Sequence, residues 1–305
     1  MANAREMRLR IRRVKNIAQV TRALEAVSAS RVRRAQEAVA ASRAYAGKAF
    51  EVLQHLALQP GSTQRLHPLL AERPEVKAVD LLMISSDRGL AGAYNINITR
   101  AAIDFSRAQS VPVRWLTVGR KGRDLAHRRG ANIAADFENY RNIPSFVESG
   151  PIVRALLDDF LDGTVDEVYL AYTDYINTVR QIPRVKRLLP LSAEDAGQQV
   201  MAEHLGAQGR RVESAYIYEP GPEALLDVIL PRFTQVQVYQ ALLEALASEH
   251  SARMVAMRNA TDNANELVGS LQLAYNKARQ LSVTSELLDI VGGVEALSKS
   301  LAGEN

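Results

Sequence analysis

Two long stretches, one at each end of the chain, repeat apolar and small residues at helical spacing. Residues 232–291 contain no proline and only one glycine, Gly269. A single helix of that length would measure about 90 Å. Its apolar and small residues step alternately by three and four positions, the period of a supercoiled helix. They are Met254, Met257, Thr261, Ala264, Val268, Leu271, Tyr275, Ala278, Ser282 and Ser285. A helix too long for one globular core needs a partner helix.

The N-terminal stretch, residues 5–58, offers that partner. It contains no proline and one glycine, Gly47. The same spacing recurs at Ile17, Val20, Leu24 and Val27, and again at Ala35, Ala38, Ser42, Ala46, Ala49, Leu53 and Leu56. We therefore expect the two ends to form a long antiparallel coiled coil, with the residues between them looped out as a separate body. The pattern leaves one alternative open, two independent amphipathic helices packed on a globular core.

The middle of the chain alternates between strand and helix patterns. Strands are expected at 76–84, 113–118, 132–136, 167–172 and 185–189, and helices at 96–108, 120–129 and 152–161. The first strand is a nearly continuous apolar run, which is typical of a strand covered on both faces. The alternation predicts a mostly parallel sheet with helices on both sides, a Rossmann-like α/β domain inserted between the long helices.

These patterns divide the chain into three segments. We expect an N-terminal shaft helix at 1–58, an α/β foot domain at 75–195 and a C-terminal shaft helix at 213–305, with the two shaft segments forming one coiled-coil unit. Residues 192–213 have little periodicity and are expected to form a loop or hinge. Three prolines, Pro220, Pro222 and Pro231, lie near the expected start of the last helix.

Composition excludes several kinds of chemistry. The chain of 305 residues has room for two domains, and it has no cysteine, which excludes disulfides, thiolate catalysis and cysteine-bound zinc or iron–sulfur sites. No stretch approaches the roughly 18–20 apolar residues of a membrane span, so we expect no direct membrane insertion. The five histidines, His55, His67, His127, His204 and His250, lack the spacing of metal ligands.

The formal net charge of +4 conceals a strongly basic N-terminal segment. Between Arg5 and Arg34 there are ten Lys or Arg residues but only two acidic residues, Glu6 and Glu25. Such a helix could be part of a basic coiled-coil scaffold that binds nucleic acid, which is one alternative function. The absence of aromatic residues before Tyr45 favours a solvated or partner-facing basic surface. An arginine-rich start also resembles a transit peptide, but its helical phase continues unbroken, which favours mature protein in a cytoplasmic compartment.

The best candidate for chemistry is the loop after the first predicted strand, Ser85–Gly92. Glycines at this place in an α/β fold could let the backbone approach a phosphate. A second basic turn, Gly119-Arg120-Lys121-Gly122, follows the second strand. Neither dinucleotide-binding nor P-loop spacing is present, so a nucleotide-binding enzyme is only a second alternative. We expect no catalytic residue, cofactor or metal site.

Three segments of the chain resemble the gamma subunit of bacterial F-type ATP synthases, the central rotor shaft. The first comprises Arg10-Ile11, Val14–Asn16, Val20–Val27 and Arg33–Gln36. The second comprises Ser86–Gly92 and Tyr94-Asn95. The third and most specific comprises Ala252–Met257, Ala260–Ala264, Leu271–Gln280, Thr284–Glu286 and Glu295–Leu297. Because the matches keep their order and include both ends, the resemblance covers essentially the whole chain.

The resemblance implies a mechanical, non-catalytic role. The antiparallel helix pair would stand inside a ring of three alpha and three beta subunits, and the α/β body would lie with the epsilon subunit on the membrane c-ring. Proton (or sodium) flow would turn the shaft, and the rotation would drive conformational change at the catalytic sites in ATP synthesis or hydrolysis. The protein would be peripheral, at the cytoplasmic face of the bacterial inner membrane, and would bind no nucleic acid.

The match also implies particular subunit contacts. Arg279 and Gln280 would form a polar contact with a loop of the beta subunit, although Arg279 could instead be an ordinary exposed helix charge. The other implied contacts are Leu24, Arg33, Arg34, Asp87 and Arg88, and an apolar tip in a bearing formed by Leu287, Leu288, Ile290, Val291 and Leu297. The basic helix would face acidic segments of the beta subunits.

Two departures from the family pattern affect these expectations. Leu24 stands where many members carry methionine, a volume-conserving exchange that we expect to be tolerated. The regulatory dithiol of photosynthetic members has no counterpart in a chain without cysteine, so thiol control is excluded.

Overall fold

The computed structural model describes residues 4–57, 67–140, 143–191 and 222–302. Side chains are described for these residues except those of 43–57, 222–224 and 295–302. The chain separates into two compact units: residues 1–27 with 256–305, and residues 28–255. Two very long helices each contribute to both units. The expected loop at 192–213 lies outside the described residues.

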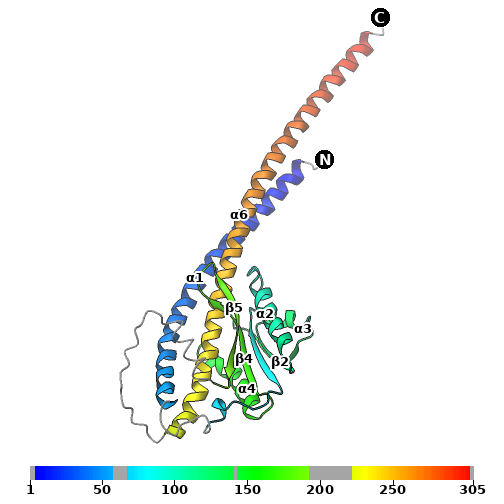
Figure 1. Ribbon diagram of the computed structural model, residues 1–305. Helices are drawn as coiled ribbons and strands as arrows, with labels where there is room; N and C mark the ends of the chain where they lie inside the picture. Colours follow the sequence, from blue (N-terminus) through cyan, green and yellow to red (C-terminus); the bar gives the residue numbers. More distant parts are fainter. Residues whose placement is uncertain (1–3, 58–66, 141–142, 192–221, 303–305) are drawn as a thin grey trace. The chain divides into compact units, whose positions relative to one another are not determined.

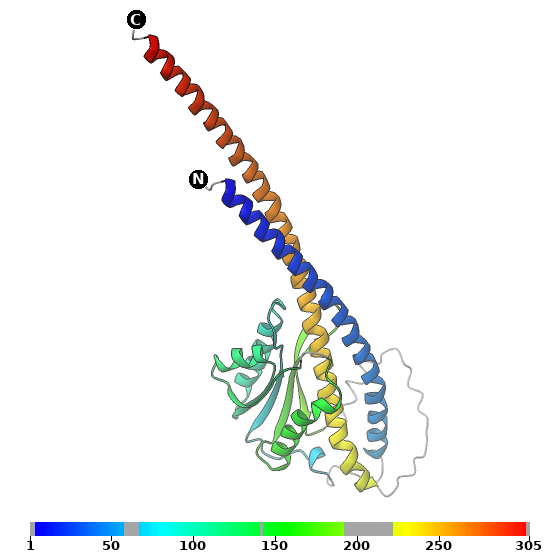
Figure 2. The same cartoon turned by 180° about the vertical axis from the view of Figure 1, so that it is seen from behind.

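The two predicted end helices are each continuous (Figures 1 and 2). Helix α1 spans Ala4–Ala57, and helix α6 spans Pro222–Ala302, a length of 81 residues. Helix α6 begins ten residues earlier than the proline-free pattern indicates, because Pro222 occupies its start, where proline is tolerated. Pro231 lies inside the helix, where the buried side chains of Leu230 and Phe233 hold the chain against the core.

In the first compact unit, α1 and α6 pack antiparallel through small side chains. Thr21 and Thr261 meet directly, with their Oγ1 atoms 2.7 Å apart. Ala18 and Ala264 are also buried, at 8% exposure each. Thr261 and Ala264 are therefore seam residues as predicted. Farther along α6, four predicted seam residues are half-buried: Val268, Leu271, Tyr275 and Ala278.

The predicted seam on α1 is confirmed at Ala35, which is fully buried, but most of its first part, Ile17–Val27, is wrong by one position. Ile17, Val20 and Val27 are 54%, 57% and 50% exposed, whereas Ala18 and Thr21 are buried. Two helices that approach closely require small residues at their contact, so the large apolar residues lie on the outer face. On α6, the expected seam residues Ser282 and Ser285 are exposed, so the seam ends before them.

The second compact unit contains a five-stranded sheet of order β3-β2-β1-β4-β5. Its strands are β1 Val79–Ile84, β2 Val113–Val118, β3 Asn132–Phe137, β4 Glu167–Tyr175 and β5 Gln181–Leu189. The first four are parallel, and β5 pairs antiparallel with β4. The mostly parallel sheet is therefore confirmed. The last two strands form a hairpin and are longer than predicted. Strand β4 ends three residues later than expected, and β5 begins four residues earlier.

Helices cover both faces of this sheet, as expected. On one face, α2 (Tyr94–Ala108) and α3 (Arg120–His127) pack against Leu81, Met83 and Trp115. On the other face, α4 (Gly150–Leu161) and the first part of α6 pack against Leu82, Leu116 and their neighbours. Two short 3-10 helices complete the domain, Pro68–Leu70 and Val147–Ser149. The long helix α6 is thus a layer of the α/β domain as well as part of the helix pair.

Candidate functional site

The loop after β1 packs tightly on the turn that begins α3. The Ser85 Oγ atom lies 2.9 Å from Val118 O and 3.0 Å from Gly119 O, and it accepts a 2.9 Å hydrogen bond from Gly122 N. A Cβ atom at Gly122 would lie 2.4 Å from Ser85 Oγ, and Gly119 has a φ of +93°. These glycines therefore allow two loops to pack against each other, and they leave no opening for a phosphate.

The two predicted contact residues of this loop have different surroundings. Asp87 points inward: its Oδ1 accepts a 3.2 Å hydrogen bond from Arg120 N, and its Oδ2 accepts one of 3.0 Å from Asn139 N. The side chain of Arg88 is exposed. Asp87 therefore stabilises the loop, and Arg88 is the residue that a partner could reach.

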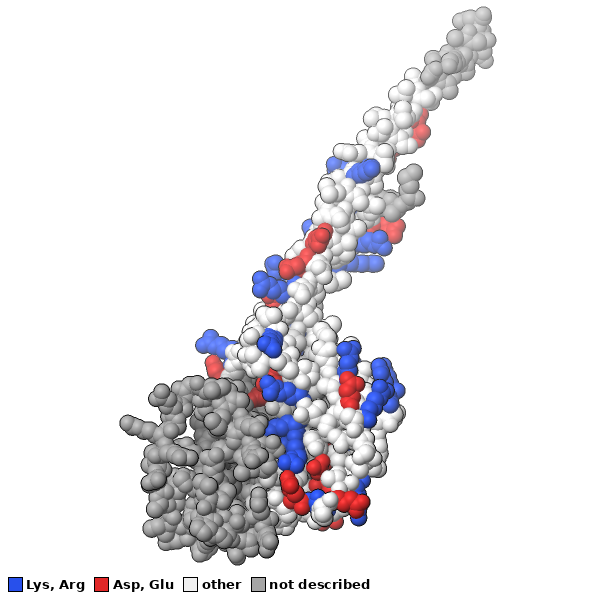
Figure 3. All heavy atoms as spheres, in the orientation of Figure 1, with Lys and Arg blue, Asp and Glu red and all other residues white. Residues whose placement is uncertain are grey.

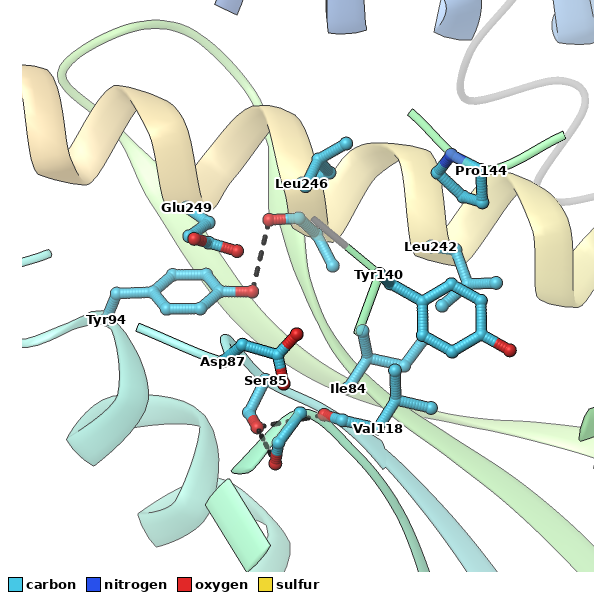
Figure 4. A pocket seen from close by; sticks show the side chains of 12 residues that line it. Ile84, Ser85, Asp87, Tyr94, Val118, Tyr140, Pro144, Leu242, Leu246 and Glu249 are labelled. Atoms are coloured by element: carbon cyan, nitrogen blue, oxygen red, sulfur yellow. Dashed lines mark hydrogen bonds between the residues drawn. The ribbon is translucent and has the colours of Figure 1, made fainter. Parts of the chain in front are cut away.

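A small cavity lies between this loop and α6 (Figure 4). Its volume is ≈ 20 Å³, which is room for one or two water molecules and far too little for a nucleotide. Leu242, Ala245 and Leu246 of α6 line it, and Tyr94 OH donates a 3.1 Å hydrogen bond to Ala245 O. The protein's own helix occupies the sheet edge at which α/β folds bind ligands. This geometry does not support a nucleotide-binding enzyme.

The predicted contact residues of α6 lie on its exposed C-terminal part. Arg279 and Gln280 are both exposed. Leu288 and Val291 are 66% and 61% exposed, and they belong to a run of exposed apolar side chains. The run comprises Leu281, Val283, Leu287, Leu288, Ile290, Val291 and Val294. Exposed apolar side chains in this number indicate a surface that a partner covers. The side chain of Leu297 lies outside the described residues.

The predicted contact residues of α1 are accessible to different degrees. Leu24 is half-buried, whereas Arg33 and Arg34 are exposed. Arg33 Nε lies 3.3 Å from Glu37 Oε1, an exposed pair that contributes little to stability. Of the ten basic residues between Arg5 and Arg34, only Arg31 is half-buried, so the helix presents a basic surface. Figure 3 shows basic side chains along the helices with some acidic ones between them.

Two of the histidines with described side chains, His67 and His250, have structural surroundings, and the third, His127, is exposed. His67 Nδ1 accepts a 3.1 Å hydrogen bond from Leu69 N and caps a 3-10 helix. His250 is buried, and its Nδ1 lies 3.2 Å from Arg253 Nη1. No group of three potential metal ligands occurs among the residues whose placement is described.

Sequence reasoning missed a buried charged pair on α6. Glu249 and Arg253 are four residues apart, which in a helix is typical of an exposed ion pair. Their side chains are instead only 12% and 11% exposed, with Glu249 Oε1 2.7 Å from Arg253 Nη2. No signal in a single sequence distinguishes this pair from a surface pair.

Comparison with known proteins identifies the family. A family model described as "ATP synthase" matches residues 3–297. A protein of Dehalococcoides mccartyi, the ATP synthase gamma chain, is 48% identical over 98% of this chain and 100% of its own length. This chain belongs to the ATP synthase gamma chain family. Gamma chains of Roseiflexus castenholzii and Legionella pneumophila are 43% and 39% identical over 98% and 97% of it. As a gamma chain, the protein is a non-catalytic subunit of the ATP synthase.

Solved structures share the fold of this gamma chain. One is the Euglena gracilis mitochondrial ATP synthase in an OSCP/F1/c-ring structure, rotational state 3. Its matching chain has a TM-score of 0.64 and 20% identity, with 96% of this chain and 94% of that one covered. The central stalk and c-ring structure of the Tetrahymena thermophila enzyme gives a TM-score of 0.57 over 79% of this chain. Within the part of this gamma chain that is described, every helix is too short or too polar to cross a membrane.

Proposed function

We propose that this gamma chain is the central rotor-stalk subunit of an F-type ATP synthase and couples rotation of the membrane c-ring to conformational change at the alpha and beta subunits. The observation that carries this proposal is the whole-length match to gamma chains, which includes both helical ends and the α/β domain. The packed sheet edge supports a mechanical role, since the loop after β1 has no room for a nucleotide.

The surface of the helix pair supports a mechanism based on unequal contacts. On α1, the apolar residues Ile17, Val20 and Val27 are exposed, and basic residues surround them. The part of α6 that packs against this segment carries exposed acidic residues instead, Asp262 and Glu266. A rotor whose surface differs from side to side makes different contacts with each surrounding beta subunit. The contact free energy therefore differs among the three catalytic sites, and rotation shifts each site in turn between open and closed states.

We assign the subunit contacts residue by residue within this mechanism. Arg279 and Gln280 form the polar contact with a beta-subunit loop, and Leu288 and Val291 belong to the apolar bearing. The contacts on α1 and on the loop after β1 are Leu24, Arg33, Arg34 and Arg88, with Asp87 holding the loop that presents Arg88. Acidic segments of the beta subunits meet the basic surface of α1. This attraction weakens with added salt because exposed charges are screened.

The α/β domain then stands at the foot of the stalk, with the epsilon subunit and the c-ring as its partners. Proton flow through the membrane sector supplies the torque. In this proposed arrangement the gamma chain is a peripheral subunit at the cytoplasmic face of the bacterial inner membrane.

Reconstitution with alpha and beta subunits tests the proposal. The gamma chain should co-purify with them as one complex, and the complex should hydrolyse ATP much faster than alpha and beta subunits alone. The isolated gamma chain should bind ATP no tighter than millimolar. Submillimolar ATP binding that is lost on replacing Gly89 and Gly92 would overturn the proposal in favour of an enzyme.

A further inference from the structure

Arg253 of α6 is a buried charge that bonds to backbone carbonyls outside its own helix as well as to two neighbours on α6. Its side chain reaches the loop after β1, where Nε donates a 3.3 Å hydrogen bond to Gly89 O and Nη2 donates one of 3.2 Å to Arg88 O. The residue is only 9% exposed. Because the acceptors belong to the backbone, the contact fixes the path of the loop itself.

Two neighbours on α6 hold the guanidinium in this orientation. Glu249 Oε1 lies 2.7 Å from Nη2, and His250 Nδ1 lies 3.2 Å from Nη1. An arginine can only donate, so His250 Nδ1 must accept, and the imidazole is neutral with its proton on Nε2. Burial and the charge of Arg253 lower the pKa of His250 to about 3, in agreement with a neutral ring. The planar group is thus bonded to the loop and to its own helix.

Arg253 lies near the end of the compact unit that contains the α/β domain. That unit ends at Val255, two residues beyond Arg253. One turn before Arg253, Ser248 Oγ donates a 3.0 Å hydrogen bond to Thr173 O at the end of β4. Nearer its start, α6 contacts the sheet through apolar side chains. Ser248 and Arg253 therefore add directional polar contacts to the apolar ones near the place where the helix leaves the domain.

We propose that Arg253 is a positioning residue for rotary coupling, which fixes the loop after β1 to α6 so that torque on the α/β domain turns the helix. The free energy of apolar burial depends on the area removed from water and has no preferred direction. A guanidinium fork bonded to two carbonyls has a fixed geometry and resists displacement around the helix surface. This role rests on the rotor function proposed above and adds a residue to it.

The informative variant is Arg253→Lys. A lysine keeps the positive charge beside the buried Glu249, so the folded state does not contain an unpaired buried carboxylate. It lacks the planar fork, however, and cannot reach both carbonyls as arginine does. Arg100→Lys is the matched control, because Arg100 is an exposed residue of α2 in the same domain.

Hydrogen exchange in the reconstituted complex shows whether the variant releases the loop. Exchange of the amides of residues 86–92 should rise about tenfold in Arg253→Lys, as expected for the loss of one charge-assisted hydrogen bond. Arg100→Lys should match the wild type. An unchanged rate in Arg253→Lys would show that Arg253 does not hold the loop, and would overturn the proposal.

Angular fluctuations of the rotor show whether this contact transmits torque. A probe on a single introduced cysteine, Ser110→Cys, reports the angle of the α/β domain while turnover is stopped. The variance of this angle should rise by up to about twofold in Arg253→Lys, since lysine can keep only one of the two hydrogen bonds to Gly89 O and Arg88 O. Faster amide exchange with an unchanged angular variance would show that Arg253 only holds the loop locally, and would overturn its role in rotary coupling. Failure of the wild-type chain to assemble or rotate would instead reject the rotor function itself.

Discussion

Buried charged side chains are the residues that the sequence could least reveal. Asp80 lies in β1, where all six residues are buried, and it reads as one polar position in an apolar run. Its partner, Arg114, comes from the neighbouring strand, with Nε 3.5 Å from Asp80 Oδ1. Arg114 also binds Asp159 of α4 at 2.8 Å. One arginine is thus shared by two acidic side chains from distant parts of the sequence. The spacing of residues along a single segment cannot predict such a cluster.

Asp80 should make stability depend on pH. Burial raises its pKa from 3.8 to about 7, opposed by Arg114 and reinforced by Asp159. Between these two values the folded state keeps a proton that the unfolded state releases, so the free energy of unfolding falls as pH rises. The slope from one such group is at most about 1.4 kcal/mol per pH unit. Asp80→Asn should remove this slope, and should therefore raise the unfolding midpoint at pH 8 more than at pH 5.

Urea unfolding across this pH range measures the effect. The control is Asp104→Asn, at an exposed position of α2, which should leave the slope as in the wild type. An Asp80→Asn protein with the wild-type slope would show that Asp80 does not titrate in this window.

The glycines of the α3 turn provide a second test. A Cβ atom at Gly122 would lie 2.4 Å from Ser85 Oγ and 2.8 Å from Met83 Cε. Gly122→Ala should therefore cost about 1–3 kcal/mol of stability through overpacking. The same substitution at Gly269, in helix α6 with nothing within 4 Å of the new atom, should stabilise the protein by up to about 1 kcal/mol. Denaturant midpoints that moved in the same direction for both variants would contradict this account.

At the scale of elements, the sheet was predictable and the helix seam only partly so. Apolar runs such as that of β1 locate strands because both faces of a parallel sheet are covered. On the first part of α1, the large apolar residues predicted the wrong face of the helix, since Ile17 and Val20 are exposed while Ala18 and Thr21 are buried. Periodicity gives the spacing of a seam, but it cannot say whether close packing favours the small residues one position away.

Close packing of the helix pair makes a direct prediction about size. Ala18 is 8% exposed at the contact, whereas Ala23 on the same helix is exposed. Ala18→Leu should force the helices apart and destabilise the pair by about 1–3 kcal/mol. Ala23→Leu should change stability by less than about 0.5 kcal/mol. Thermal unfolding followed by far-ultraviolet circular dichroism would compare the two, and equal midpoints would place the seam elsewhere.

For the whole molecule, the sequence supplied the family and the helix–domain–helix order, because the motifs at both ends keep their order. It did not reveal that α6 also covers the sheet. Leu226, Leu230 and Phe233 of α6 are part of the domain core, and they precede the regular pattern that first marked the helix. An apolar helix layer and an apolar shaft seam look alike in sequence, so only the tertiary structure divides α6 between them.

The proposed polar contact with the beta subunit belongs to this scale. Charge-assisted hydrogen bonds contribute roughly 1.5–3 kcal/mol each. If Arg279 and Gln280 bind only at certain rotor angles, Arg279→Ala with Gln280→Ala should slow steady-state ATP turnover of the complex about tenfold. Helicity should not change, because both residues are exposed.

Lys277→Ala is the control, an exposed cation two residues from Arg279 and on the opposite side of the helix from that residue. It should retain normal turnover. Normal turnover in the double variant, with assembly verified by size, would show that Arg279 and Gln280 are ordinary solvated surface residues.

The continuity of α6 also makes the angular position of its tip depend on its length. The helix runs unbroken from Pro222 to Ala302, so each added residue turns everything beyond it by about 100° and moves it about 1.5 Å along the axis. One residue inserted between Val255 and Arg279 would therefore advance the tip by nearly the 120° spacing of three equivalent sites in a ring. Seven inserted residues would return it to within about 20° of its starting angle. In the proposed rotor, the number of residues in this helix would therefore set how far the contact residues of its tip are turned about the helix axis.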